Sequence, residues 1–254
     1  MSFATHPIAN SNASRQDLID TFGVPAQKCQ VFWNSLADPM ANSVLPSADR
    51  VDRPNPRHFV CVGRFTASKG QDILLEAMAE VARKYPDITI EFIGHGKDRD
   101  SCEKLACQLG VRKNCVFAGQ LPHPQVLSRM TGMWATIVPS RNEAFGLMTI
   151  ESMAVGVPVI GANTGGIAEI VRDGVDGFLF PPGDHKALAK RMIQLMEDES
   201  LRAGMAKNAR LRFLEQFELS RAVRTEARWI IKQIGGATNG PPRATVAAPF
   251  SNSM

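Results

Sequence analysis

Residues 139–151 read PSRNEAFGLMTIE and follow a short apolar run at residues 135–138. We interpret this segment as the connection between a buried strand and a helix. Glu143 then stands where the carboxyl end of the strand meets the start of the helix, and the backbone amides of residues 144–147 are among the unpaired donors there. Ligands of open α/β sheets bind at this edge, so the segment is a candidate binding site.

Short apolar runs alternate with helical patterns on both sides of this segment. Six runs predict β-strands, at residues 59–62, 88–93, 115–118, 135–138, 157–160 and 178–180. Alternation of strands and helices predicts an α/β fold with a doubly wound, parallel six-stranded sheet of the Rossmann-like kind. Helical patterns continue after the last strand, and we expect one domain from residue 58 to 234.

The loop after the first predicted strand carries two cations, in Val62-Gly63-Arg64 and Lys69-Gly70. Arginine binds phosphate oxygens through two donors, lysine adds a point charge, and the start of a helix supplies further donors. The loop therefore suits a diphosphate, although an ordinary solvated turn is the alternative. It matches neither a Walker loop nor a G-x-G-x-x-G fingerprint.

Two carboxylates frame the 139–151 segment, because Glu151 stands eight positions after Glu143. A helix of that length would rise about 12 Å, which suits opposite ends of one long ligand such as a nucleotide-sugar. The alternatives are an acidic residue favoured by the helix dipole for Glu143 and a solvated helix position for Glu151. The glycines of Gly165-Gly166, after the fifth strand, allow either a sharp turn or the close approach of a ligand.

The composition argues against several other classes of protein. The net charge is +4 without runs of Lys or Arg, so we expect no nucleic-acid partner. The five cysteines include no C-x-x-C pair, and the histidines lack metal-ligand spacing, so we assign no metal and no cofactor. No apolar stretch reaches the length of a membrane span. We expect a cytoplasmic protein, either free or peripheral to the inner face of the membrane.

Taken in order, these segments resemble family 4 of the retaining glycosyltransferases, which have a two-domain B fold. The resemblance covers about residues 59–228 and rests on the two loops above, on AVGVPV at 154–159 with Gly165-Gly166, and on Asp173-Gly174 before GFL at 177–179. It implies the C-terminal, nucleotide-sugar-binding half of such an enzyme. In the family, a nucleotide-diphosphate-sugar is the donor substrate and no metal is needed.

The resemblance assigns roles to residues of this chain. Arg64 and Lys69, beside Gly63, match residues that bind the donor diphosphate, and Glu151 matches one that binds ribose. Glu143, with the backbone of Phe145, Gly146 and Leu147, matches the part that holds the transferred sugar. We therefore expect Glu143, Arg64 and Lys69 to be the catalytic residues and the others to bind the donor.

The chain departs from the family in its first part. Residues 1–57 resemble only the last stretch of the N-terminal acceptor domain plus a linker, with NSLAD at 34–38 where an Asn-Gly turn is usual, and we expect residues 235–254 to be a disordered tail. The first hypothesis is thus an enzyme half for polysaccharide, lipopolysaccharide or glycolipid synthesis. It would act on a carbohydrate or lipid-linked acceptor, with the acceptor domain either supplied by a separate N-terminal-domain polypeptide or lost from a truncated chain. The second hypothesis is a non-catalytic nucleotide-sugar-binding module or remnant that lacks the acceptor domain. A third and more distant hypothesis is a sugar-nucleotide epimerase.

Overall fold

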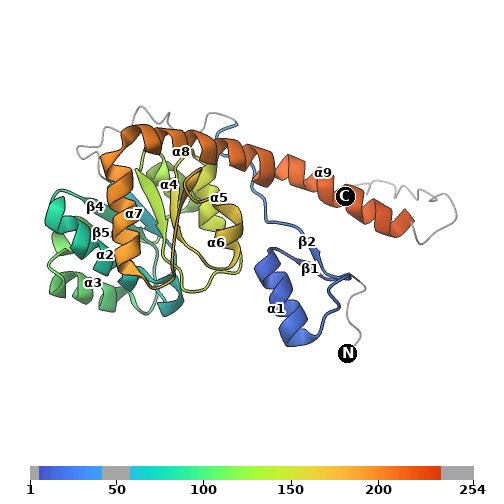
Figure 1. Ribbon diagram of the computed structural model, residues 1–254, viewed down its shortest axis with the longest axis horizontal. Coiled ribbons are helices and arrows are strands. Elements are labelled where there is room, and N and C mark those ends of the chain that lie inside the picture. Colours follow the sequence, from blue (N-terminus) through green and yellow to red (C-terminus); the bar gives the residue numbers. More distant parts are fainter. Residues whose placement is uncertain (1–5, 42–57, 236–254) are drawn as a thin grey trace, which may run out of the picture.

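A computed structural model describes residues 6–41 and 58–235 of the chain (Figure 1). Its main sheet has six parallel strands in the order β5-β4-β3-β6-β7-β8. The strands are β3 (His58–Val62), β4 (Thr89–Ile93), β5 (Cys115–Gly119), β6 (Ala135–Val138), β7 (Val159–Ala162) and β8 (Gly177–Phe180). The predicted fold class, an α/β fold with a six-stranded parallel sheet, is confirmed.

The predicted and observed strand boundaries differ most at β7, which begins at Val159 and not at Val157 as predicted. Pro158 lacks a backbone N–H, so it cannot take a full place in the ladder. Its carbonyl still accepts a hydrogen bond from the amide of Thr136 at 3.0 Å. The apolar run therefore starts two residues before regular pairing begins.

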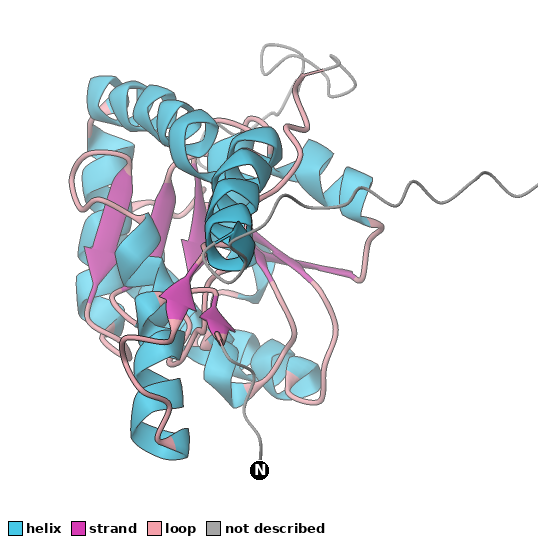
Figure 2. Ribbon diagram, turned by 90° about the vertical axis from the view of Figure 1, so that its right-hand side faces the viewer, coloured by secondary structure: helices cyan, strands magenta, loops and turns pink. Residues whose placement is uncertain are grey.

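Helices cover both faces of the sheet (Figures 1 and 2). One face packs against α2 (Gln71–Lys84), α3 (Arg99–Gln108) and α7 (His185–Glu197), and Asp184 caps α7 as its position suggests. The other face packs against α4 (His123–Met130), α5 (Leu147–Ala154), α6 (Gly165–Ile170) and α8 (Glu199–Arg212). Successive side chains of a strand point to opposite faces of the sheet. In β3, Phe59 and Cys61 therefore contact the first layer of helices and Val60 contacts the second.

The N-terminal segment lies beside this body as a small unit of its own. Its strands β1 (Ile8–Ala9) and β2 (Gln30–Val31) pair in parallel, and α1 (Asn12–Phe22) connects them. The helix α9 (Leu219–Gly235) runs from the body past this unit (Figure 1), and the ring of Trp229 meets that of Phe32 edge to face at 5.4 Å. The expected linker, with Pro54 and Pro56, and the expected tail after residue 235 lie outside the described residues.

Glu169 joins the N-terminal unit to the body by capping α1 from another part of the chain. Its carboxylate accepts hydrogen bonds from the backbone amides of Asn12 and Ala13, both at 2.9 Å, and from the indole of Trp33 at 3.3 Å. Burial would raise the pKa of Glu169, but these donors outweigh burial and hold the pKa below its ordinary value. Arg210 adds a second connection, through two hydrogen bonds to Asp38 at 2.8 and 2.6 Å.

Glu169→Ala should loosen α1 from the body, because the amides of Asn12 and Ala13 lose their acceptor. We expect their hydrogen exchange to accelerate by roughly 10-fold or more, given about 1.5–3 kcal/mol for hydrogen bonds to a charged group. Mass spectrometry of the exchanged chain measures this. Asp17→Ala, at an exposed carboxylate of the same helix, is the control. Equal exchange in both variants would show that Glu169 does not hold the segment.

Candidate functional site

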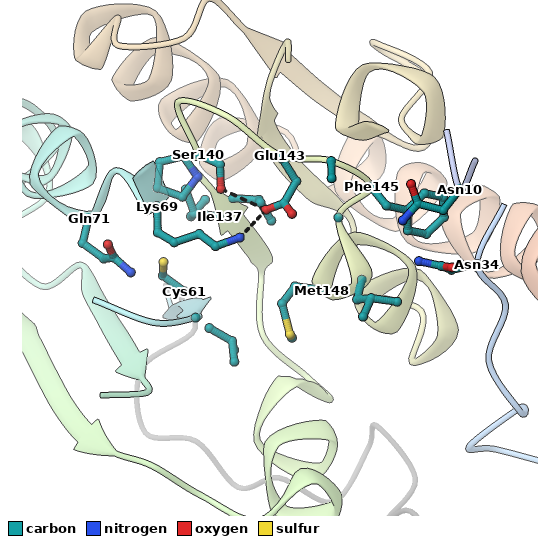
Figure 3. Close-up of a pocket in the computed structure, with 17 residues that line it drawn as sticks. Asn10, Asn34, Cys61, Lys69, Gln71, Ile137, Ser140, Glu143, Phe145 and Met148 are labelled. Atoms are coloured by element: carbon teal, nitrogen blue, oxygen red, sulfur yellow. Dashed lines mark hydrogen bonds and ion pairs between the residues drawn. The ribbon is translucent and has the colours of Figure 1, made fainter. Parts of the chain in front are cut away.

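A cavity of about 260 Å³ opens where β3 and β6 end at the carboxyl edge of the sheet. The loop after β3, the loop between β6 and α5, and the N-terminal unit form its walls (Figure 3). Seventeen residues line it, namely Asn10, Asn34, Cys61, Val62, Gly63, Lys69, Gln71, Ile137, Val138, Pro139, Ser140, Glu143, Ala144, Phe145, Gly146, Leu147 and Met148. The two loops that the sequence singled out therefore share one cavity.

Lys69 and Glu143 form an ion pair inside this cavity. The distance from Lys69 Nζ to Glu143 Oε2 is 2.5 Å, and Ser140 Oγ donates a hydrogen bond to the same oxygen at 3.3 Å (Figure 3). The side chains of Lys69 and Glu143 are 28% and 16% exposed, so a ligand in the cavity can reach both. Glu143 Oε1 has no hydrogen-bond partner within residues 6–41 and 58–235, which leaves it available to a ligand.

Close backbone contacts bring these two side chains together. Gly70 has a φ of 69°, and a Cβ atom there would overlap the carbonyl of Pro139. Gly165 has a φ of 48°, and a Cβ atom there would overlap the carbonyl of Glu143. The glycine loop after β7 thus supports the turn that carries Glu143, and a hydrogen bond from the amide of Gly166 to the carbonyl of Glu143, at 3.1 Å, fixes the contact.

Arg64 lies apart from this ion pair. Its side chain is exposed, does not line the cavity and has no hydrogen bond or ion pair in the described part of the chain. Its carbonyl accepts a hydrogen bond from the side chain of Gln71 at 2.9 Å, which fixes the backbone while the guanidinium stays free to reorient. Gly63, the residue before it, does line the cavity.

The turn at residues 144–147 presents its backbone to the cavity. The amides of Ala144, Phe145 and Gly146 have no acceptor among the described residues, and Gly146 is the residue from which α5 starts. Phe145 is only 3% exposed and its ring packs against Phe217, so its backbone is what a ligand meets. Since α5 begins at Leu147, the interval from Glu143 to Glu151 is only partly helical. The rise of about 12 Å that the sequence suggested for a fully helical interval therefore does not apply.

Glu151 is buried on α5 and does not line the cavity that holds Glu143. It is 8% exposed, which rules out the solvated helix position that the sequence left open. Its Oε1 lies 3.3 Å from His123 Nε2, and its buried Oε2 has no hydrogen-bond partner. Burial raises the pKa of Glu151, while the neighbouring His123 opposes that shift. An unsatisfied buried carboxylate of this kind is a candidate for a ligand contact.

Asn10, Asn34 and His123 belong to the site region but were not assigned to it from the sequence. Asn10 directly follows β1, and Asn34 comes three residues after β2, so both lie at the carboxyl ends of paired parallel strands. That position was a usable signal. β1 is only two residues long, which hid it from the sequence. Residues 30–33 do have a strand-like pattern, but the sequence does not show that this strand pairs with β1.

Neither a metal-binding cluster nor a membrane-spanning helix is found among the residues that the structure describes. No group of three or more His, Cys, Asp or Glu side chains there is arranged to hold a metal ion. None of the helices in those ranges is both long and apolar enough to cross a membrane.

Comparison with known proteins gives one family match. The model described as "Glycosyl transferases group 1" matches residues 48–212. A D-inositol 3-phosphate glycosyltransferase of Corynebacterium urealyticum is 34% identical over 155 residues, which cover 58% of this chain and 37% of that protein. A glycogen synthase of Mycobacterium tuberculosis is 28% identical over 239 residues, 94% of this chain and 57% of that one. This chain thus spans between about two fifths and three fifths of these relatives.

Solved structures with a similar fold include the following two. HepE from Anabaena, in complex with UDP and glucose, has a TM-score of 0.79 and 27% identity, and the match covers 90% of this chain and 63% of that one. The C-terminal domain of the glycosyl transferase group 1 family protein LpcC from Francisella tularensis has a TM-score of 0.61 and 27% identity. That match covers 65% of this chain and 88% of the solved one.

Glu151→Met should stabilise the ligand-free protein at pH 8, because it removes a buried charge with an unsatisfied oxygen. A gain of ~1 kcal/mol would raise the melting temperature by about 2–4 °C. The pKa of Glu151 is raised in the fold, so the native state binds the proton more tightly than the unfolded state, and the cost appears as the pH rises above the ordinary value of 4.5.

The gain should therefore shrink as the pH falls to 4.5 and vanish below it, where Glu151 is protonated in both the folded and the unfolded state. Thermal unfolding at several pH values measures this, with Glu80→Met on α2 as the control at a more exposed glutamate. A gain that does not depend on pH would mean that packing, and not the buried charge, is responsible.

Proposed function

Because this chain belongs to the glycosyl transferases group 1 family, we propose that it forms the nucleotide-sugar-binding half of a retaining glycosyltransferase of family 4. Its place would be the C-terminal half of a two-domain B-type enzyme. The observation that carries the proposal is the Lys69–Glu143 ion pair, in a cavity at the carboxyl edge of a doubly wound sheet. The likeness to HepE, which is in complex with UDP and glucose, supports a nucleotide-sugar as the donor.

The ion pair carries both charges that such a donor would need. A diphosphate that enters the cavity replaces Glu143 as the partner of Lys69, and Glu143 is then free to accept hydrogen bonds from the hydroxyls of the transferred sugar. The exchange keeps Lys69 paired throughout, which limits the cost of desolvating its charge. Arg64 is exposed and has no partner in the described part of the chain, so its side chain can reorient and bind the diphosphate as a second cation.

The remaining donor contacts follow from the groups that lack partners. The amides of Phe145, Gly146 and Leu147 face the sugar end, beside Glu143. Glu151 binds the ribose hydroxyls through its unsatisfied Oε2, since a buried carboxylate without a donor gains most from one. On this arrangement, Gly63 allows the diphosphate to approach the backbone after β3.

Catalysis would rest on stabilising the leaving diphosphate. Lys69 and Arg64 neutralise the charge that develops as the bond to the sugar breaks, and we propose that neither a metal ion nor another cofactor takes part. Glu143 orients the sugar, and the acceptor attacks from the face that the diphosphate leaves, so that configuration is retained. Such a reaction would serve polysaccharide, lipopolysaccharide or glycolipid synthesis, in the cytoplasm or at the inner face of the membrane.

Enclosing a carbohydrate or lipid-linked acceptor for transfer would require a second domain, and we propose an N-terminal domain, either on a separate N-terminal-domain polypeptide or on the same polypeptide. The match to HepE covers 63% of that chain, and the uncovered share is large enough for such a domain. A second candidate function is a module that binds a nucleotide-sugar without turnover, since all of the proposed donor contacts lie within this chain. Transfer of labelled sugar to added acceptors by the purified chain would exclude this second candidate.

Lys69→Ala and Arg64→Ala should each weaken the binding of both UDP and UDP-glucose, because both ligands carry the diphosphate. We expect a loss of about 1.5–3 kcal/mol each, the usual range for hydrogen bonds to charged groups. Glu151→Ala should also weaken both ligands, since they share the ribose. Glu143→Ala should weaken only UDP-glucose, and should leave UDP binding unchanged or slightly tighter because Lys69 loses a competing partner.

Titration calorimetry of each variant with both ligands measures these effects. Lys104→Ala, which removes an exposed cation of α3 away from the cavity, is the matched control. The site model is wrong if Glu143→Ala and Glu151→Ala weaken the two ligands by the same ratio. The whole proposal fails if the unmodified chain binds neither ligand.

A further inference from the structure

Asn10 and Asn34 present two unused amide side chains to the cavity. Both line it on the side opposite Lys69 and Gln71 (Figure 3). Neither side chain makes a hydrogen bond within the described ranges 6–41 and 58–235, although each can donate two and accept two. Partly buried amides without partners at the mouth of a cavity are suited to a polar, uncharged ligand.

The N-terminal unit holds these amides in place relative to Glu143. Ser11, the residue after Asn10, donates a hydrogen bond from Oγ to the carbonyl of Ala144 at 2.6 Å. Glu169 caps the helix that starts at Asn12. Ser11 follows Asn10 and Ala144 follows Glu143, so this hydrogen bond fixes the backbone at Asn10 relative to the backbone at Glu143.

The cavity continues away from Lys69. A second cavity of about 560 Å³ shares Asn10, Asn34 and Leu147 with the first, and its further wall includes Phe32, Trp33, Ser35 and Glu226. It contains aromatic rings, amides, a hydroxyl and a carboxylate. None of the described residues that line this second cavity is a lysine or an arginine.

The charges that line the two cavities favour a different kind of ligand in each. The proposed donor is accounted for at the other end, by Lys69 for the diphosphate and by Glu151, which faces α4 through His123, for the ribose. A phosphorylated molecule in the second cavity would meet Glu226 and no cation from its described walls. A molecule with many hydroxyls and no charge would meet amides, a hydroxyl and ring faces, which are the usual partners of sugars.

We propose that Asn10 and Asn34 bind hydroxyl groups of an uncharged carbohydrate acceptor, and that the cavity beyond Leu147 holds its next sugar unit. This inference rests on the proposed function, because it takes the donor to lie beside Lys69 and Glu143. It adds the chemical class of the acceptor and two residues that recognise it. The acceptor end that reacts lies at Asn10 and Asn34, next to Glu143.

The test follows the side-chain amide signals of Asn10 and Asn34 by NMR in the full 254-residue chain. The signals are identified by their loss in Asn10→Ala and Asn34→Ala. The chain is first saturated with UDP and then titrated with neutral trisaccharides (maltotriose, cellotriose and mannotriose), and in parallel with glucose and glucose 6-phosphate. We expect at least one neutral trisaccharide to shift both signals, and glucose 6-phosphate to shift them less than glucose does.

Each of Asn10→Ala and Asn34→Ala should weaken the binding of that trisaccharide by roughly 3–10-fold, the loss expected for one neutral hydrogen bond. UDP affinity should stay unchanged in both variants, which also shows that they fold. Gln108→Ala, at an exposed amide of α3 outside both cavities, should change neither ligand.

Three results would overturn the inference. If UDP binds but no neutral trisaccharide shifts either signal, the acceptor inference is wrong while the donor proposal stands. If glucose 6-phosphate binds more tightly than glucose at these residues, the acceptor class is charged and the inference is wrong. If UDP itself does not bind, the proposed function fails and the acceptor inference falls with it.

Discussion

The close contact between loop backbones at the carboxyl edge of the sheet is the constraint on which the site depends. Gly70 lies against the carbonyl of Pro139, and Gly165 lies against the carbonyl of Glu143, at distances that leave no room for a Cβ atom. These contacts lock three loops into one rigid wall. As a result Lys69 meets Glu143, although 74 positions separate them in the sequence. A site assembled in this way keeps its geometry before any ligand binds, which favours binding because little order remains to be imposed.

The same wall leaves several polar groups without partners. Glu151 Oε2 is buried and unsatisfied, the amides of residues 144–146 have no acceptor, and the side chains of Asn10 and Asn34 are unused within the described residues. Such groups cost stability in the ligand-free protein. Buried atoms without a partner also occur away from the site, such as Asn114 Oδ1 and Arg202 Nε. The side chains of Asn10 and Asn34 and the amides of residues 144–146, however, belong to residues that line one cavity. Unsatisfied groups gathered in one place are typical of a binding site.

Much of the fold was predictable because each strand is a short apolar run between helices, and all six strands were located from that pattern. Pro158 shifted one boundary, since the apolar pattern of a strand does not reveal where its hydrogen bonds begin. The loops that carry Gly63, Lys69 and Glu143 were predictable because they follow strands. The pairing of Lys69 with Glu143, the burial of Glu151 and the separation of Arg64 from both were not, because they depend on contacts between loops. Asn10 was missed because a strand of two residues leaves almost no periodic pattern. Asn34 was missed because the strand-like residues 30–33 do not reveal that they pair with β1 beside the cavity.

The central claim is that a nucleotide-sugar opens the Lys69–Glu143 ion pair and lies between its two members. A crystal structure of this chain with UDP-glucose tests it most directly. The account predicts the diphosphate within hydrogen-bonding distance of Lys69 and Arg64, the ribose at Glu151, and the glucose at Glu143, with the ion pair broken. A bound ligand that leaves the ion pair intact, or that lies outside the cavity between β3 and β6, would contradict it.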